Sequence, residues 1–253
     1  MLNYLRSEWY RTVRRKYLYL FVGVVVLIAA AYFALIRFNQ IAFGIEEILP
    51  FLVLLLPNTG LYAILLVHDA AFSDEHKHGT MKNTISFGVP RTRVYFGKLL
   101  NSLLFCVLSL AALVALIIGS GLLLGGVGDW QDFEEGMQFL GKTLLASFPL
   151  WLCGVAAANA LSCNIRSSVG WVFAYIGVFN GFNLLLRALS GVIPVCRTIR
   201  EYLPSYLLSQ LGEGALLEGA GNSLMGLCWI VGLTAAAIFI AAGLAVFCRT
   251  EVK

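Results

Sequence analysis

The sequence has few charged residues for its length. Only 13% of its 253 residues are Asp, Glu, Lys or Arg, whereas an average soluble domain has roughly 25%. A chain with about half the usual charge cannot cover a water-facing surface, so the composition excludes an ordinary soluble protein. Instead, 59% of the residues are hydrophobic and the mean hydropathy is +0.82. We therefore predict an integral membrane protein.

The hydrophobic residues form runs long enough to cross a bilayer, which takes about 20 residues per helix. We predict an all-α protein with six transmembrane helices and one membrane domain over residues 1–253. The predicted spans are Tyr17–Ile36, Ile48–His68, Val94–Leu124, Phe139–Ser162, Val169–Leu189 and Leu224–Phe247. Most of the 18 Lys and Arg residues flank these spans on the side of the two termini. By the positive-inside rule, both termini are predicted to be cytoplasmic.

The spans lack Asp, Glu, Lys and His away from their ends. Pumps driven by protons or ions place such residues inside the membrane to relay the proton or bind the ion. Membrane-embedded enzymes need nucleophiles, bases or metal ligands there. Both classes are disfavoured, and we expect no catalytic residue. Secondary transport stays possible, but nothing in the sequence would couple it to an ion gradient.

The six cysteines form no CxxC pair, and most of them lie in or near the predicted spans. We interpret them as small apolar core residues. Asp74, Glu75, His76 and His78 form the one cluster that suggests a metal. An H-x-H spacing in a polar connection is common, and a solvated loop is the simpler interpretation. We expect no metal, no cofactor bound by this chain and no nucleic-acid partner.

One stretch fits a nucleotide-binding pattern. Gly136 to Thr143 reads GMQFLGKT, which matches the G-x-x-x-x-G-K-[ST] of a phosphate-binding loop. Such a loop needs a preceding strand and a helix N-terminus aimed at the phosphates. Here an acidic segment, GVGDWQDFEEG, precedes a predicted span. We interpret the match as a coincidence, with Lys142 reaching the headgroups and Thr143 capping or packing the helix start, and predict no nucleotide-binding domain.

Residues 1–16, MLNYLRSEWYRTVRRK, have the pattern of an amphipathic helix. One face carries Leu2, Leu5, Trp9 and Val13, and the opposite face carries Asn3, Ser7, Arg11 and Arg14. Such a helix is suited to lie in the membrane interface with its basic residues towards anionic headgroups. We predict an interfacial helix that uses Trp9, Arg11 and Arg14 in this way. A basic flank that only sets the topology would show the same charges.

The second connection, residues 69–93, is the densest polar segment of the chain. Ser73 can cap a first turn, and Thr80 can cap a short helix that reaches Phe87. Gly79 and Gly88 would flank that helix. A short helix that lies along the cytoplasmic surface of the membrane is suited to dock into a groove of another protein.

At this segment the chain resembles the permease subunits of type-2 ATP-binding-cassette exporters. Those permeases often carry E-x-x-x-G-T-x-K-N, a short apolar helix, an Arg, and Gly-Lys at the third span. The matching residues here are Glu75, Gly79, Thr80, Lys82, Asn83, Arg91, Gly97 and Lys98. The layout of the whole chain is similar too, and in size it is closest to small bacterial permeases for peptide, bacteriocin-immunity or bacitracin-type export.

The resemblance implies the membrane subunit of an ATP-driven exporter in a bacterial cell membrane. The helix Thr80–Phe87 would be a coupling helix seated in a separate ATPase subunit, and residues 187–223 would form outer re-entrant helices that close the exit. Two copies, or two related permeases, would work among membrane lipids with two ATPases that hold ATP and Mg²⁺. The residues implied in coupling are Glu75, Gly79, Thr80, Met81, Lys82, Asn83, Ile85 and Arg91.

The spans contain a few neutral polar residues, which are Asn58, Thr59, Asn180 and Asn183. They either hydrogen-bond between helices or line a path for an amphipathic substrate, for which a peptide is favoured. Gly177 and Gly181 give a small-xxx-small face, which suits a dimer or packing within one copy. A lipid-linked molecule, a drug or sodium as the substrate remains an alternative, as does a passive scaffold or channel.

Overall fold

The computed structural model describes residues 2–38, 44–78, 86, 88–165, 167–214, 216 and 221–249. Within these residues the chain is helical and contains no strand, which confirms the predicted all-α class. Six segments are long and apolar enough to cross a membrane, which confirms the multi-pass membrane fold. They are Tyr19–Phe38, Ile45–Asp69, Arg91–Leu124, Trp130–Asn164, Val169–Leu189 and Gly221–Arg249.

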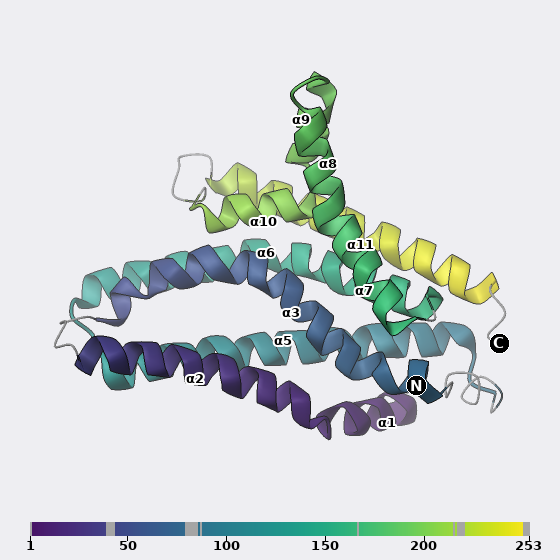
Figure 1. The fold of residues 1–253 in the computed structure, drawn as a ribbon, viewed down its shortest axis with the longest axis horizontal. Coiled ribbons are helices and arrows are strands. Elements are labelled where there is room, and N and C mark those ends of the chain that lie inside the picture. The colour runs from purple at the N-terminus through teal and green to yellow at the C-terminus, as the bar shows by residue number, and fades with distance from the viewer. Residues whose placement is uncertain are drawn as a thin grey trace.

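The first half of the chain forms a bundle of long helices. Helix α1 is Leu2–Val13, α2 is Lys16–Phe38, η1 is Ile45–Glu47, α3 is Leu49–His78 and α5 is Arg91–Leu124. In Figure 1, α2, α3 and α5 lie along the long axis of the molecule beside α6, and both ends of the chain lie at the same end of the bundle. We call this the terminal end.

Helix α6, Trp130–Asn164, is the centre of the bundle and packs against α3 and α11, Gly221–Arg249. Glycines bring the backbones close together. A Cβ built on Gly232 of α11 would lie 2.5 Å from the carbonyl carbon of Pro149 in α6. Because apolar side chains gain nothing from leaving water inside a bilayer, such close packing is what holds membrane helices together.

Two aromatic side chains fix α6 and α7, Ser168–Ile176, against α3. The Trp151 indole Nε1 donates to the Pro57 carbonyl at 2.9 Å, and the Tyr175 hydroxyl donates to the Leu61 carbonyl at 3.0 Å. Gly60 makes room for this contact, because its Cβ would lie 2.6 Å from the Trp151 ring. Pro57, whose nitrogen has no hydrogen to donate within α3, therefore takes part in a helix–helix contact through its carbonyl oxygen.

The fifth span consists of α7, a π-helical segment η2, Gly177–Gly181, and α8, Phe182–Leu189. Helix α9, Pro194–Glu201, folds back on α8, and in Figure 1 the two form an arm that rises away from the bundle. Helix α10, Pro204–Gly212, returns to pack on α3 and α6. The segment expected to hold re-entrant helices therefore contains α9 and α10, and their role in closing an exit stays a prediction.

The second connection is shorter than the sequence predicted. Helix α3 continues without a break to His78, so Ser73 lies inside a helix and caps no separate turn. Residues 69–78 extend the helix of the second span beyond Asp69, where the candidate span ends, because they contain no proline or glycine that would end the helix.

The fourth helix begins earlier than predicted. The Asp129 carboxylate accepts a hydrogen bond from the Gln131 backbone N–H at 2.7 Å and caps the helix there. Thr143 therefore does not cap a helix start. It is fully buried and donates to the Phe139 carbonyl at 3.0 Å.

Candidate functional site

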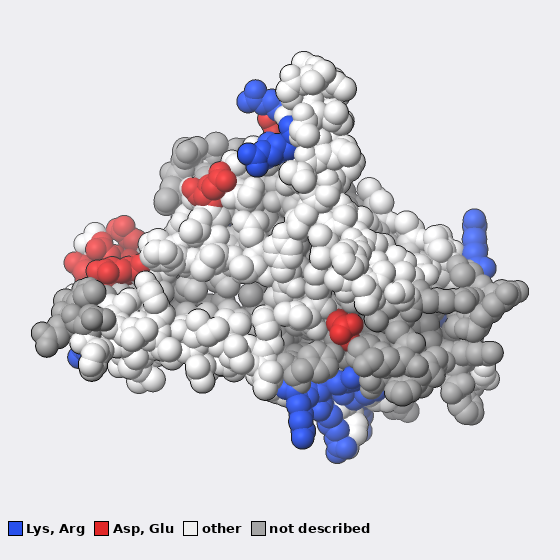
Figure 2. Space-filling model, viewed as in Figure 1, with Lys and Arg blue, Asp and Glu red and all other residues white. Residues whose placement is uncertain are grey.

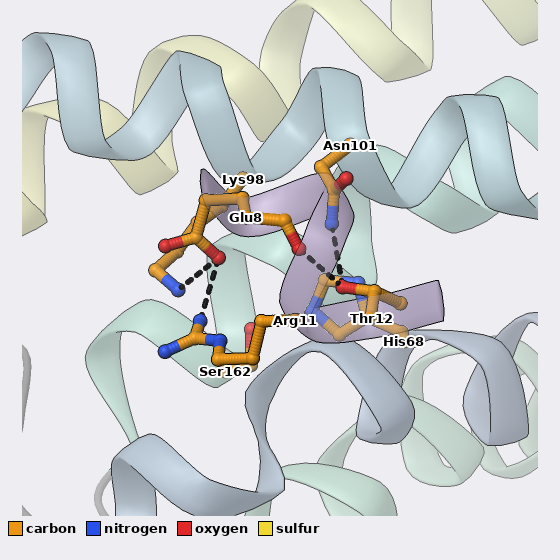
Figure 3. A network of polar contacts seen from close by, with 7 residues as sticks. All are labelled: Glu8, Arg11, Thr12, His68, Lys98, Asn101 and Ser162. Atoms are coloured by element: carbon orange, nitrogen blue, oxygen red, sulfur yellow. Dashed lines mark hydrogen bonds and ion pairs between the residues drawn. The ribbon is translucent and has the colours of Figure 1, made fainter. Parts of the chain in front are cut away.

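A buried polar network joins α1 to the long helices at the terminal end (Figure 3). Its acid is Glu8, whose side chain is 7% exposed. Glu8 Oε2 lies 2.6 Å from Arg11 Nη2 and 3.7 Å from Lys98 Nζ, and the Lys98 side chain on α5 is 1% exposed. Two cations share one carboxylate, which offsets part of the cost of burying these charges.

A chain of hydrogen bonds continues the contact between α1 and α5. The Asn101 amide donates to Thr12 Oγ1 at 3.0 Å, and Thr12 Oγ1 donates to the Glu8 carbonyl at 3.0 Å. The side chains of Thr12 and Asn101 are buried. Beside them, the rings of Trp9 and Phe105 lie 4.5 Å apart. Helix α1 is therefore held by charge, hydrogen bonds and ring packing together.

His68 and Ser162 extend the network from α3 to α6. His68 Nε2 lies 2.7 Å from Ser162 Oγ, and both side chains are buried. The Ser162 hydroxyl also donates to the Asn159 carbonyl at 3.2 Å, and this geometry suits a His68 tautomer with the proton on Nε2, which would donate a hydrogen bond to Ser162 Oγ. The His68 ring also meets the Trp171 ring of α7 edge-on at 5.4 Å. Figure 3 shows this pair beside the Thr12 part of the network.

The nucleotide-like stretch has no phosphate-binding geometry. Gly136–Thr143 lies wholly inside α6, six residues after the helix begins. Its backbone N–H groups are engaged in the helix and do not converge on a ligand. The Lys142 side chain is exposed.

A comparison with protein families decides the class of the chain. The model of the ABC-2 family transporter protein matches residues 4–181, which is more than half of the sequence. The chain belongs to the ABC-2 transporter family. Among curated proteins, no sequence matches the chain. The family match runs from α1 to η2 and includes the whole polar network.

Membership of the ABC-2 family makes the chain the transmembrane component of a transporter and implies that it pairs with an ABC ATPase subunit. Of the residues implied in coupling, Arg91 has a described side chain. Its Nη1 donates to the Cys248 carbonyl at 2.9 Å and to the Phe247 carbonyl at 3.3 Å, and so ties the start of α5 to the end of α11.

The other coupling residues are not tested. Glu75 lies near the end of α3, where the backbone alone is described. The rest lie outside the described residues, and they are Gly79, Thr80, Met81, Lys82, Asn83 and Ile85.

A helix, α1, forms where the sequence predicted an interfacial helix, and its place at the membrane interface stays a prediction. Some of its residues contact the rest of the protein, and others are exposed. Trp9 and Arg11 contact Phe105 and Glu8, respectively. Arg14 is exposed and lies over the Tyr10 ring, with its Cζ 4.1 Å from the centroid. The Arg11 side chain therefore points into the network of this ABC-2 chain, whereas Arg14 is free to face headgroups.

The polar residues of the second span lie near those of the fifth. Asn180 Oδ1 accepts from the Tyr62 hydroxyl at 2.8 Å, which joins η2 to α3. Thr59, one turn before Tyr62, is exposed and donates to the Leu55 carbonyl at 2.7 Å. Asn58 is half-buried. Hydrogen bonding between helices is therefore observed for Asn180, and a translocation path along this face stays a prediction.

The small-xxx-small face of the fifth span is open within one copy. A Cβ built on Gly177 or Gly181 would meet nothing within 4 Å. Packing within one copy, which the sequence left as an alternative, is therefore not seen at these two glycines. Asn183, two residues after Gly181, has hydrogen-bond partners within the chain: it accepts from Arg200 Nε at 3.0 Å and donates to Ser205 Oγ at 3.3 Å.

The sequence analysis missed the central pair of the network, Glu8 and Lys98. A signal for it exists. Glu8 lies between Leu5 and Trp9 in the sequence and so borders the apolar face of the helix. Lys98 lies inside a segment long enough to be a span. An acid that borders an apolar face and a lysine inside a span indicate a buried pair.

Proposed function

We propose that this ABC-2 chain is the membrane subunit of an ATP-driven exporter. It would use a separate ATPase to move an amphipathic substrate, for which we favour a peptide, out of the cytoplasm. The observation that carries the proposal is the buried polar network at the terminal end. It joins α1, α3, α5 and α6 beside the connection in which the coupling helix is expected.

The network could transmit movement of the connection between α3 and α5 to the neighbouring helices. The connection between α3 and α5 is attached to both helices, and His68 and Asn101 lie near its two ends. A push from a closing ATPase would reach α1 through Asn101, α6 through Ser162 and α11 through Arg91. Because buried polar contacts are directional and costly to break, these helix ends are expected to move together. ATP and Mg²⁺ would bind to the partner subunit.

The open face of the fifth span supports a paired arrangement. Tyr62 is 43% exposed and bonds to Asn180 beside the open glycines Gly177 and Gly181. Polar groups at this depth are costly against lipid. We propose that a second copy, or a related permease, covers this face and that the substrate path runs between the two.

Reconstitution of this chain with its partner ABC ATPase, identified by copurification, tests the proposal. We expect no ATP turnover by the chain alone in lipid vesicles, and turnover with transport when both proteins are present. The transport assay follows labelled peptides, a labelled lipid and sodium into inverted vesicles, so that the substrate class is read directly. If the vesicles accumulate the lipid or sodium and no peptide, the substrate is that molecule and the preference for a peptide is wrong.

Two variants test the coupling segment. Glu75→Ala and Gly79→Ala are expected to abolish transport while the ATPase and the chain still copurify. Glu135→Gln, an exposed acid on α6, is the matched control and is expected to transport normally. If both coupling variants transport like the control, the segment is not the coupling element.

A further inference from the structure

The arm formed by α8 and α9 carries a polar cavity that the proposed export mechanism does not use. Its volume is about 370 Å³, and its lining is Ser190, Gly191, Arg197, Arg200, Glu201 and Tyr206. Its first residue directly follows Leu189, the last residue of the fifth span, which places the cavity at the depth of lipid headgroups. Figure 2 shows basic groups on one flank of the arm, in a surface that is mostly uncharged.

Arg200 is held in a fixed orientation in this cavity. Its Nε donates to Asn183 Oδ1 at 3.0 Å, and Asn183 is itself anchored by donating to Ser205 Oγ at 3.3 Å. The guanidinium lies over the Tyr206 ring, with Cζ 4.6 Å from the centroid. In the part of the chain that the structure describes, Nη1 and Nη2 have no protein acceptor. These two nitrogens are therefore available as a fork for a ligand.

The cavity has an excess of positive charge. Arg197 adds a second guanidinium, and among the described lining residues Glu201 supplies the one carboxylate. Arg197 Nε and Glu201 Oε1 lie 3.8 Å apart, and their side chains are 79% and 50% exposed. An exposed pair at this distance contributes little, so an incoming anion can replace Glu201 as the partner of Arg197.

We propose that this cavity binds a phosphate group, with Arg200 as its bidentate ligand and Arg197 as a second cation. A planar guanidinium fork matches two oxygens of a phosphate. The phosphate can come from a phospholipid headgroup or from a free phosphate ion. Val192 directly follows the lining residue Gly191 and is 82% exposed, which gives an acyl chain an apolar side chain to contact. The site needs neither the ATPase nor the network at the terminal end.

Binding to the full chain in dodecyl maltoside tests the site. The probes are short-chain phosphatidic acid, the matching diacylglycerol without phosphate, and inorganic phosphate, with native mass spectrometry counting the bound lipid. We expect phosphatidic acid to bind and diacylglycerol not to bind. Competition by millimolar inorganic phosphate would identify free phosphate as a source, whereas its failure would identify the headgroup. Competition by acetate at equal concentration would overturn the proposal, because the site would then be a carboxylate site.

Three variants distinguish binding in this cavity from nonspecific attraction of an anion to positive charge on the protein surface. Arg200→Gln and Arg197→Gln are expected to weaken binding by about ten-fold or more, since hydrogen bonds to charged groups account for roughly that factor. Glu201→Gln is expected to tighten binding, because it removes the competing carboxylate. Arg187→Gln, an exposed arginine on α8 outside the cavity, is the matched control. Equal losses in Arg187→Gln and Arg197→Gln, or weaker binding by Glu201→Gln, would overturn the proposal even if Arg200→Gln fails to fold.

Discussion

Replacing Glu8 by Gln tests whether the buried ion pair holds α1 in place. The change keeps the size of the side chain and removes the charge between Arg11 and Lys98. The Arg11 side chain is 32% exposed and can turn to water, whereas the Lys98 side chain is 1% exposed and cannot. The cost of the substitution therefore falls mainly on Lys98, which would lose the carboxylate of Glu8 while its own side chain stays buried.

The size of the effect follows from this geometry. Breaking one partner out of a buried pair costs about 3–5 kcal/mol. Because Lys98 Nζ is 3.7 Å from the carboxylate and has further interactions, we expect about 2–3 kcal/mol. In a chain of this size, 1 kcal/mol lowers Tm by about 2–4 °C. Glu8→Gln is therefore expected to melt about 4–12 °C lower.

A thiol-reactive dye measures this transition in detergent. The side chains of Cys153 and Cys228 are fully buried, so they react when the bundle opens. Glu135→Gln is the matched control and is expected to melt like the parent. Adding Lys98→Met to Glu8→Gln should restore most of the loss, since an apolar residue in place of a buried charge is often neutral or stabilising. A further loss in the double variant, or no loss in Glu8→Gln, would refute this account of the network.

Three other substitutions have outcomes fixed by the surroundings of the changed residue. Gly232→Ala would place a Cβ 2.5 Å from the Pro149 backbone. It should lower the free energy of unfolding by about 1–3 kcal/mol, measured in the same melting assay. Gly226→Ala, which adds a Cβ in open space on the same helix, is the control and should leave Tm unchanged. Gly181→Leu should leave Tm unchanged but lower the fraction of cross-linked pairs in lipid; unchanged cross-linking would argue against this face as the pair interface. Lys142→Ala should leave ATP turnover of the reconstituted complex unchanged, and a loss would mean that GMQFLGKT acts as a nucleotide site after all.

The sequence predicted the spans well because hydropathy responds directly to the bilayer. The fifth span, Val169–Leu189, has the same bounds in the structure as in the prediction. Helix ends were predicted less well, because local caps and continuations decide them. The Asp129 cap starts α6 nine residues before the predicted start of the fourth span at Phe139.

The polar network could not be assembled from sequence because its members are far apart along the chain. Glu8 and Lys98 are ninety residues apart, and His68 and Ser162 are ninety-four apart. The pattern of residues within one helix can show that a charged or polar residue lies at a position where an apolar one is expected. It does not show which residue of another helix is its partner. The sequence placed Lys98 in the Gly-Lys of the family pattern but did not predict that its side chain is buried.

The two parts of the bundle are held together by different means, and this difference bears on how the protein could move. Around α6, close glycine contacts and a buried polar pair hold α3 and α11 against it, and α5 packs beside them. We therefore expect these helices to shift together. The fifth span instead contains a π-helical segment, a feature often found at functional sites, with open glycines on it and an arm beyond it. A displacement that enters at the terminal end would pass through the locked helices and reach the fifth span through Tyr62–Asn180 and Tyr175–Leu61. We therefore expect the rearrangement to be concentrated on the fifth span, where the π-helical segment and the open glycines lie.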